Sequence, residues 1–261
     1  MSVRRDVQGG VATLTLDRPD VRNAFDEAMT TGLARELATV SIDDAVRCVV
    51  ITGAGRGFSA GQDLRDRSDD ILAGRDLHLG EELRRRYFPV VRMIRSMPKP
   101  VVAAVNGPAV GAGFGLACVC DVRVASTEAT FRAAWARVGL APDAGAAFYL
   151  PRLVGWGRAF DLMLSGDALG AEEALRIGLV TRVFDAAVFA EEVARFARSL
   201  AAGATLAFAL TKQELERAST PSLDDFLELE ARLQEQAGRS RDYVEGVRAF
   251  LEKREARFEG R

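Results

Sequence analysis

The chain has 261 residues, of which 48% are hydrophobic and 28% are charged. These proportions favour a folded protein with a large buried core and exclude a disordered chain or a fibrous repeat. The net charge is -2 and lysine occurs only at positions 99, 212 and 253, so no basic patch for nucleic acid is indicated. Because no apolar run approaches the roughly 18 residues that span a membrane, we predict a cytoplasmic protein with no membrane partner.

The first half of the sequence predicts a β-α-β beginning. Residues 11–16 alternate apolar and polar side chains as a strand does, and residues 48–52 and 101–105 are continuous apolar runs typical of buried strands. Between the first two, residues 26–40 carry apolar side chains at helical spacing, with Asp26 placed to cap the helix. We therefore expect an α/β protein.

The second half of the sequence predicts mostly helices. Apolar side chains recur at helical spacing in residues 159–165, 171–177, 189–200 and 205–217. Later in the chain, Ser222 followed by Asp225 forms a capping box that opens a helix to about residue 236, and Asp242 is placed to cap a last helix. No linker rich in Pro, Gly or Ser separates the two halves, so we predict one α/β core that continues directly into a helical extension. The core covers residues 1–200, and the C-terminal extension, residues 201–261, is suited to oligomer contacts.

Several reactive or ionisable side chains have structural interpretations. Cys48, Cys118 and Cys120 lie in apolar runs, without a further cysteine or histidine pair at a spacing that ligates a metal. We predict buried, inert thiols and no metal site. Asp63 and Asp121 flank turns or strand ends, where aspartate commonly hydrogen-bonds the backbone, so we expect structural roles there.

A glycine-rich segment follows the strand predicted at residues 101–105. Its sequence NGPAVGAGFG begins at Asn106 and places glycines at 111, 113 and 115 before an apolar helical run. Free N–H groups at a helix start, approached closely because glycine has no side chain, suit an anion or a developing oxyanion. The spacing differs from the Gly-x-Gly-x-x-Gly of dinucleotide sites. Taken alone, the glycines are equally explained by close helix packing.

A second glycine-rich segment follows the strand predicted at residues 48–52. The sequence GAGRGFSAGQDL covers residues 53–64, and by itself it reads as a long turn that needs positive φ angles. Loops after strand ends are where α/β proteins bind ligands. Two such loops, each giving one N–H to the same carbonyl oxygen, would form an oxyanion hole.

The two segments together resemble the landmark motifs of the crotonase (enoyl-CoA hydratase/isomerase) superfamily. The resemblance covers nearly the whole chain, through LTLDRPDVRNAF, PKPVVAAVNGPAVGAGFGLA, FRAAWARVGLAPDAG and the tail GVRAFLEKREARF. It implies a ββα spiral core with a helical C-terminal extension, a CoA thioester as substrate and no cofactor beyond that CoA. It also implies a homotrimer or a dimer of trimers.

The resemblance assigns roles to particular positions. The backbone N–H groups of Gln62 and Ala112 match those that polarise the thioester carbonyl. Phe250 and Lys253 match tail residues that contact CoA, often from a neighbouring subunit. The remaining positions expected to contact CoA or the acyl group are Arg22, Ala24, Ala60, Gly61, Asp63, Leu64, Gly111, Gly115 and Trp135. The segment 65–87 corresponds to a variable part of the family that lines the acyl pocket.

The chemistry is narrowed by what occupies the matching catalytic positions. Hydratases of this family use two glutamates, at the positions of Gly115 and Trp135, and neither residue here can act as an acid or a base. Asp143 lies where other branches carry a single catalytic carboxylate, which suits a proton shuttle. Local sequence alone favours a helix cap at Asp143, whereas the family position favours a base with a pKa raised by apolar neighbours such as Phe148.

We therefore predict an isomerase of acyl-CoA thioesters, of the enoyl-CoA type or the ring-1,2-epoxyphenylacetyl-CoA type, which belongs to phenylacetate degradation. Alternatives are a hydratase of other specificity, a catalytically silent acyl-CoA-binding protein and an aryl-CoA dehalogenase. Dehalogenases carry the pair matching Trp135 and Asp143, but their water-activating histidine matches Arg92 here. The single histidine, His78, is interpreted as a solvated loop residue.

Overall fold

The computed structural model describes residues 2–75, 77–218 and 222–261. Its larger sheet has the strand order β1-β2-β3-β4-β6-β9, in which only β1 and β2 are antiparallel and the other neighbours are parallel. These strands are β1 (Val3–Gln8), β2 (Val11–Leu16), β3 (Cys48–Gly53), β4 (Val101–Val105), β6 (Val122–Ser126) and β9 (Arg182–Phe184). The smaller sheet contains β5 (Ala109–Val110), β7 (Thr130–Arg132) and β8 (Ala168–Gly170), in the order β5-β7-β8.

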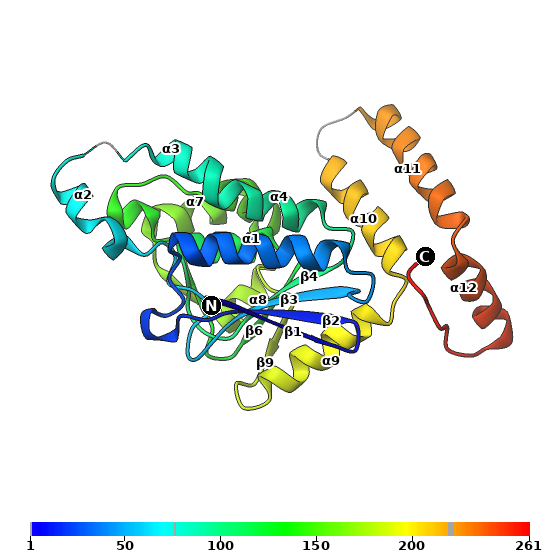
Figure 1. Cartoon of the computed structure of the whole chain (residues 1–261). Helices are drawn as coiled ribbons and strands as arrows, with labels where there is room; N and C mark the ends of the chain where they lie inside the picture. Colours follow the sequence, from blue (N-terminus) through cyan, green and yellow to red (C-terminus); the bar gives the residue numbers. More distant parts are fainter. Residues whose placement is uncertain (1, 76, 219–221) are drawn as a thin grey trace.

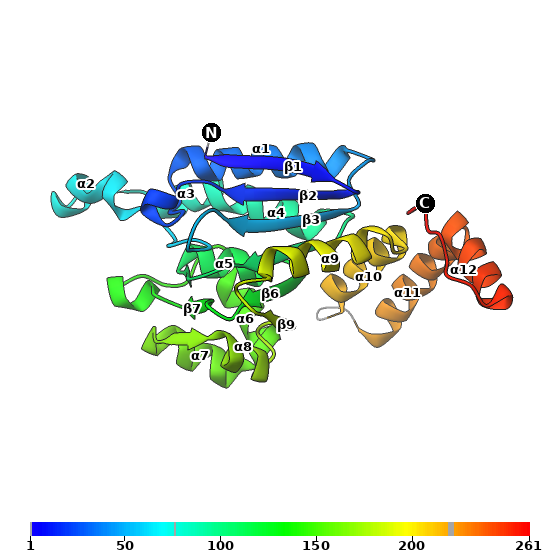
Figure 2. The same cartoon turned by 90° about the horizontal axis from the view of Figure 1, so that it is seen from below.

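Helices cover both faces of the larger sheet and form the C-terminal end of the chain (Figures 1 and 2). Those of the core are α1 (Glu27–Ile42), α2 (Ser68–Leu72), α3 (Leu79–Glu82), α4 (Phe88–Ser96), α5 (Ala112–Val119), α6 (Ala146–Val154), α7 (Trp156–Ser165), α8 (Ala171–Arg176) and α9 (Phe189–Ala201). Short 3-10 helices are η1 (Pro19–Val21), η2 (Leu64–Arg67) and η4 (Trp135–Val138), and η3 (Leu83–Tyr87) is a short, wider π-helix. The arm contains α10 (Thr205–Arg217), α11 (Leu223–Gly238) and α12 (Arg241–Glu252).

The two faces of the central strands bury different helices. Leu14 of β2 and Ile51 of β3 face the larger core cluster, which includes Leu33 of α1. The alternate residues of the same strands, such as Val50, pack instead against α9 through Val193. Because side chains alternate along a strand, continuous apolar runs are required where both faces are covered, which confirms the buried strands predicted at 48–52 and 101–105.

The predicted cap of α1 is confirmed. The Asp26 carboxylate accepts a hydrogen bond of 2.7 Å from the Met29 backbone N–H, and the helix begins at Glu27. At α11, the Ser222 hydroxyl likewise accepts from the Asp225 N–H.

The prediction that Asp242 caps the last helix is wrong. Ser240 caps α12, because its hydroxyl accepts from the Tyr243 N–H. Asp242 is buried instead, and its carboxylate accepts from the N–H groups of Glu259 and Gly260, which fastens the chain end against α12. Ser240 and Asp242 are both residue types that cap helices and lie two positions apart. The sequence does not show that Asp242 instead binds the end of the chain.

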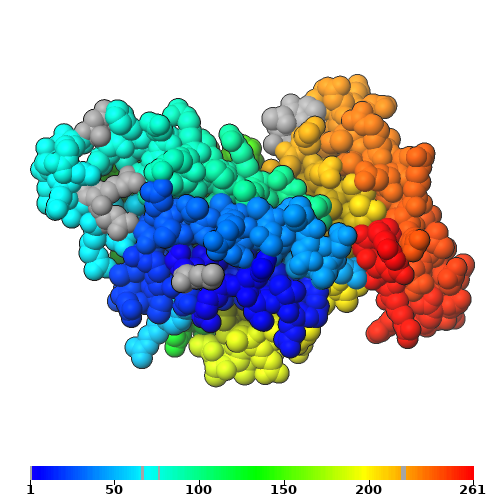
Figure 3. All heavy atoms as spheres, in the orientation of Figure 1, coloured from blue at the N-terminus to red at the C-terminus, as the bar shows by residue number. Residues whose placement is uncertain are grey.

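The arm lies at one end of the molecule. Figure 3 shows it as a lobe beside the core, and Figures 1 and 2 place it opposite the segment that carries α2. In Figure 2 the arrowheads of β2 and β3 point away from the arm, so their following loops lie at the far end. Within the described residues no single helix is long and apolar enough to cross a membrane; α9 and α10 pass that test only as a pair bent by 94°.

Candidate active site

The two glycine-rich loops run side by side. Ser59 and Ala109 form a parallel bridge, and the Val110 N–H donates to the Ser59 carbonyl at 2.9 Å. A Cβ at Gly113 would lie 2.7 Å from both the Cβ and the carbonyl oxygen of Ser59, closer than real contacts allow. Gly61 has φ +84°, and a Cβ there would lie 2.6 Å from the Val110 oxygen. The glycines of both motifs are therefore needed for close backbone approach.

This approach brings the amides of Gln62 and Ala112 to one place. Gln62 forms a parallel bridge with Phe25, in which the Phe25 N–H donates to the Gly61 carbonyl and the Asp63 N–H donates to the Phe25 carbonyl. In such a ladder the N–H of the middle residue, Gln62, points away from Phe25. A Cβ at Gly61 would lie 3.2 Å from the Ala112 nitrogen, so the side away from Phe25 faces the start of α5. Within the described residues neither the Gln62 nor the Ala112 N–H has an acceptor.

Two polar side chains that the sequence analysis passed over hold the first loop. Asn23 is fully buried, and its amide nitrogen donates to the carbonyls of Ala54 and Gly57 at 2.9 and 2.8 Å. The Ser59 hydroxyl donates to the Asn23 carbonyl and accepts from the Gly61 N–H. Asn23 and Ser59 each lie next to apolar residues, in the sequences RNAF and GFSAG. Because a buried polar side chain needs a hydrogen-bond partner, this pattern could have identified both residues as structural.

Asp143 lies beside the start of α5. A Cβ at Gly115 would lie 3.0 Å from the Ala144 Cβ and 3.2 Å from the Asp143 carbonyl oxygen, so the Asp143 loop rests directly on this helix. The interpretation of Asp143 as a helix cap is wrong, because α6 begins at Ala146 after Gly145 and has no side-chain cap. A side chain at position 115 would displace the loop that presents the carboxylate.

The Asp143 carboxylate is half-buried and its only side-chain hydrogen-bond donor within the described residues is Trp135. The indole Nε1–H donates to Asp143 Oδ1 at 2.9 Å, and Trp135 itself is buried in η4. Burial raises the pKa of Asp143 above its ordinary value, while the Trp135 hydrogen bond and the residue's own N–H oppose the rise. Phe148, expected beside this carboxylate, is 51% exposed and packs on Tyr149 and Arg152 instead.

The segments expected to hold CoA also lie together. The Ala60 N–H donates to the Arg22 carbonyl at 2.9 Å, so the exposed residues Arg22 and Ala60 are neighbours. Leu64 follows in η2 and is 47% exposed. Asp63 is buried, and its carboxylate pairs with Arg18 at 3.2 Å, so this side chain braces the loop.

Other expected contacts behave differently. Ala24 is buried, and its carbonyl accepts from the Arg18 guanidinium at 2.7 Å, so only its backbone stands close to the loop. Gly111 has φ +52° and immediately precedes α5, where its N–H donates to the Arg132 carbonyl. Phe250 and Lys253 lie on the arm at the opposite end of the molecule, so one chain does not bring them to the loops (Figure 1).

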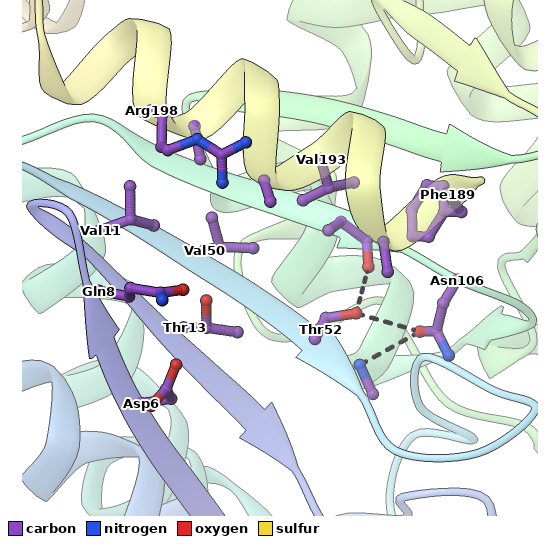
Figure 4. A pocket seen from close by; sticks show the side chains of 15 residues that line it. Asp6, Gln8, Val11, Thr13, Val50, Thr52, Asn106, Phe189, Val193 and Arg198 are labelled. Atoms are coloured by element: carbon purple, nitrogen blue, oxygen red, sulfur yellow. Dashed lines mark hydrogen bonds between the residues drawn. The ribbon is translucent and has the colours of Figure 1, made fainter.

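A separate cleft of about 290 Å³ lies on the other face of the sheet, beneath α9 (Figure 4). Arg198 overhangs it from α9, and Thr13 and Val50 form part of its floor. At its edge Asn106 accepts from the Thr52 hydroxyl and the Gly53 N–H, so this motif residue braces the end of β3. Asp143 does not line this cleft. We therefore assign the cleft no role in the chemistry.

The cysteines and acidic residues offer no metal site within the described residues. No group of three His, Cys, Asp or Glu side chains is placed to hold an ion there. Cys48, Cys118 and Cys120 are buried free thiols, as predicted, and burial raises the pKa of each to about 12.

The fold and the paired amide loops define a crotonase-type α/β protein. Its backbone superposes on an enoyl-CoA hydratase from Bacillus anthracis with a TM-score of 0.90, at 30% identity, over 100% of both chains. The enoyl-CoA hydratase/isomerase family model matches residues 6–261. The chain therefore belongs to this family of enzymes that act on CoA thioesters, and the fold class predicted from the resemblance is confirmed.

Named relatives within the family differ in activity. The chain is 46% identical to a 1,2-epoxyphenylacetyl-CoA isomerase of Escherichia coli K12, over 98% of this chain and 97% of the relative. It is 38% identical to the 4-chlorobenzoyl coenzyme A dehalogenase-2 of an Arthrobacter species, over 85% of this chain and 80% of that protein.

Proposed function

We propose that this enzyme is an isomerase of acyl-CoA thioesters, in which the N–H groups of Gln62 and Ala112 hold the thioester oxygen and Asp143 moves the proton. The substrate is an enoyl-CoA or a ring-1,2-epoxyphenylacetyl-CoA. The 46% identity to the isomerase of Escherichia coli supports the second type of substrate.

The reaction needs one base and one oxyanion site. Asp143 removes a proton from a carbon that is acidified by the thioester, and the electron pair moves into the carbonyl, whose oxygen becomes negative. The two N–H groups stabilise that enolate oxygen more strongly than the neutral carbonyl. The protonated Asp143 then returns the proton at a different carbon, so no water or second acid is consumed.

A single observation carries this proposal: within the described residues the Asp143 loop rests on α5 near the start of that helix, and the residues at the two hydratase positions beside it are a glycine and a tryptophan. Gly115 leaves room for the Asp143 loop, and Trp135 holds the carboxylate as a donor. A raised pKa brings a carboxylate closer to the operating pH, which favours a base that must both take and return a proton.

The test is Asp143→Asn, which keeps the shape of the side chain and an acceptor for the Trp135 N–H but removes the base. We expect kcat for 3-enoyl-CoA or ring-epoxide CoA isomerisation to fall by about 10²- to 10⁴-fold, as for loss of a general base. The Kd for CoA thioesters, measured by calorimetry, should stay near that of the wild type. Asp161→Asn, on the exposed face of α7, is the matched control.

Two results would contradict the assignment. Retained turnover in Asp143→Asn would remove this residue from the chemistry. Binding of thioesters by the wild type without turnover of any 2-enoyl, 3-enoyl or ring-epoxide substrate would instead identify a silent acyl-CoA-binding protein. Mass spectrometry of the products separates isomerisation, which leaves the mass unchanged, from hydration, which adds one water.

Dehalogenation of an aryl-CoA is the second candidate, favoured by the Trp135–Asp143 hydrogen bond and by the Arthrobacter relative. There Asp143 would attack the ring and chloride would leave. Hydrolysis of that intermediate requires a base for water, and Arg92, at the matching position, is an exposed guanidinium with hydrogen-bond donors and no acceptor. Chloride release from 4-chlorobenzoyl-CoA, measured with an ion-selective electrode, would favour this candidate.

We also propose a homotrimer or a dimer of trimers, in which Phe250 and Lys253 contact the CoA of a neighbouring subunit. Their place at the end of the molecule opposite the loops supports contact between subunits. The division at residue 200, the cytoplasmic location and the absence of a further cofactor stay predictions.

A further inference from the structure

The side chain of Gln62 has an unused hydrogen-bond donor. Its amide oxygen accepts from the Tyr87 hydroxyl, which fixes the plane of the amide. Its amide nitrogen is buried and has no hydrogen-bond partner within the described residues. Buried polar groups are almost always paired, and an unpaired one destabilises the folded protein, so this donor calls for an acceptor that the described part of the chain does not provide.

The place of this donor indicates what the acceptor belongs to. Gln62 gives its backbone N–H to the oxyanion site described above, so its side chain starts beside the thioester. The side chain reaches Tyr87, the last residue of η3, in the segment that the family resemblance places at the acyl pocket. An atom bound to Nε2 must therefore lie within a few bonds of the thioester carbonyl.

Tyr87 is held firmly enough to orient the amide. It is 6% exposed, and its ring packs edge-on against Phe25 with 6.1 Å between centroids. The Arg86 guanidinium lies 5.9 Å from the same ring, and Phe25 is the residue bridged to Gln62. Because the phenol donates to Oε1, the amide is oriented with its nitrogen as the free group.

We propose that Gln62 Nε2 donates a hydrogen bond to an oxygen atom carried by the acyl group, so this side chain selects oxygenated acyl-CoA substrates over hydrocarbon ones of the same shape. The selection deepens the proposed function and rests on its placement of the thioester at Gln62 and Ala112. The ether oxygen of a ring epoxide is one acceptor of this class, while an unsubstituted enoyl chain leaves the donor unpaired.

Binding of two ligands that cannot isomerise tests this selection without any turnover. 2-Methoxyphenylacetyl-CoA and 2-ethylphenylacetyl-CoA have nearly the same shape, but only the first has an acceptor oxygen on the ring. With the wild type, we expect calorimetry to give a Kd about tenfold lower for the methoxy ligand than for the ethyl ligand. The methoxy oxygen gains one hydrogen bond and also pairs a donor that is otherwise buried without a partner. In Gln62→Met, which keeps the length and loses the donor, the two Kd values should become equal.

The control is Gln213→Met, the same replacement on the exposed face of α10, which should keep the tenfold preference. Gln62→Glu provides a second variant if Gln62→Met does not fold, because a carboxylate can accept from Tyr87 but cannot donate, and it should reverse the preference. Equal Kd values in the wild type, or a preference that survives in Gln62→Met, would overturn the role of Gln62 alone. No binding of either ligand would overturn the proposed function as well.

Discussion

The pKa of Asp143, the proposed base, is subject to two opposing effects, and one of them comes from Trp135. Burial disfavours the charged form of Asp143 and raises its pKa, whereas the indole N–H favours the charged form and lowers it. Trp135 acts through Asp143, so its role is that of a positioning residue.

Trp135→Phe tests this balance by removing the N–H and keeping an aromatic ring. The pKa of Asp143 should rise further, because a stabiliser of the charged form is lost. A base works only when it is deprotonated, so the acid limb of the kcat/KM profile should move to higher pH. On that acid limb we expect kcat/KM to fall by about 10- to 100-fold, since a hydrogen bond to a charged group contributes about 1.5–3 kcal/mol.

A pH-rate profile from pH 4 to 9 checks this prediction. An equal loss at every pH, with no movement of the acid limb, would mean that Trp135 only shapes the pocket. Trp156→Phe is the matched control, because Trp156 is 76% exposed on α7 and its ring stacks on Phe160.

At the same scale, the sequence identified Asp143 and the two amides as candidates but not the residues that support them. Family position singled out Gly115 and Trp135, whose neighbours in the structure are the Asp143 loop and the carboxylate itself. The Tyr87 contact to Gln62 joins residues 25 apart through a segment with no clear periodicity. Such pairs depend on how separate elements meet, which local patterns do not encode.

At the scale of elements, the site depends on how closely the first loop approaches α5. Gly113→Ala would push Ser59 away, because the new Cβ would lie 2.7 Å from its Cβ and carbonyl oxygen. We expect a loss of about 1–3 kcal/mol in the free energy of unfolding, as for an overpacked core. With one oxyanion donor displaced, kcat should also fall by about 10²- to 10³-fold.

Denaturant unfolding and steady-state kinetics on the same preparations measure both effects. Gly157→Ala in α7 is the control, since nothing lies within 4 Å of a Cβ there and alanine favours a helix. If Gly113→Ala kept wild-type kcat, the separation of the two loops would not matter for the reaction. That outcome would argue against the oxyanion site.

Elements with strong local signals were predicted, whereas those defined only by pairing were not. The apolar runs of β3 and β4 and the spacing and cap of α1 match the structure. β1 was missed because only its first residue is buried, so its sequence lacks alternation. β5 has two residues and pairs with β7 across the chain, which leaves no local pattern to read.

At the scale of the whole molecule, a partly buried charge network joins the arm to the core. Lys212 of α10 donates to Asp121 at 2.8 Å and to the Ile94 carbonyl at 2.6 Å. Arg95 donates to the same carboxylate at 2.9 Å and also pairs with Glu216 of α10. Asp121 thus has the structural role predicted for it, accepting in addition from the Val101 N–H.

Lys212→Met should loosen the arm. It leaves Asp121 with one cationic partner fewer in a site where Lys212 is 9% exposed. Breaking a buried pair costs about 3–5 kcal/mol, and we expect a loss near the lower end because Arg95 remains. Denaturant unfolding measures the change, with the exposed Lys253→Met as the matched control. Equal stability of the two variants would show that the arm is held by apolar contacts alone.

Among the lysines, the contacts and exposure of Lys253 differ from those of the other two. Lys99 donates to the carbonyls of Val40 and Asp43, and Lys212 is paired as described, so both are structural. Lys253 is exposed at the end of α12, beside Phe250, which is 81% exposed. An exposed cation and an exposed ring at the end of an arm suit contact with a phosphate and a base of a neighbour's CoA.

Mixing two impaired variants tests whether Lys253 acts in the neighbouring subunit. Lys253→Asn removes the charge and tolerates the left-handed backbone at this position, where φ is 56°. We expect it to raise KM, whereas Asp143→Asn lowers kcat. If each site takes Asp143 from one subunit and Lys253 from the next, an equal mixture unfolded and refolded together contains intact sites. Random assembly into closed rings makes about a quarter of the sites intact.

Activity of the mixture at low substrate concentration should therefore rise to about a quarter of the wild-type value, well above the mean of the two variants. Refolding each variant separately before mixing is the control, because each oligomer is then assembled from a single variant. Sedimentation measures the mass of the oligomer in the same samples. Intact sites can form in the mixture only when Asp143 and Lys253 of one site come from different subunits. A mixture no more active than the mean of its components would therefore place Lys253 outside the neighbouring site, even if sedimentation shows a trimer.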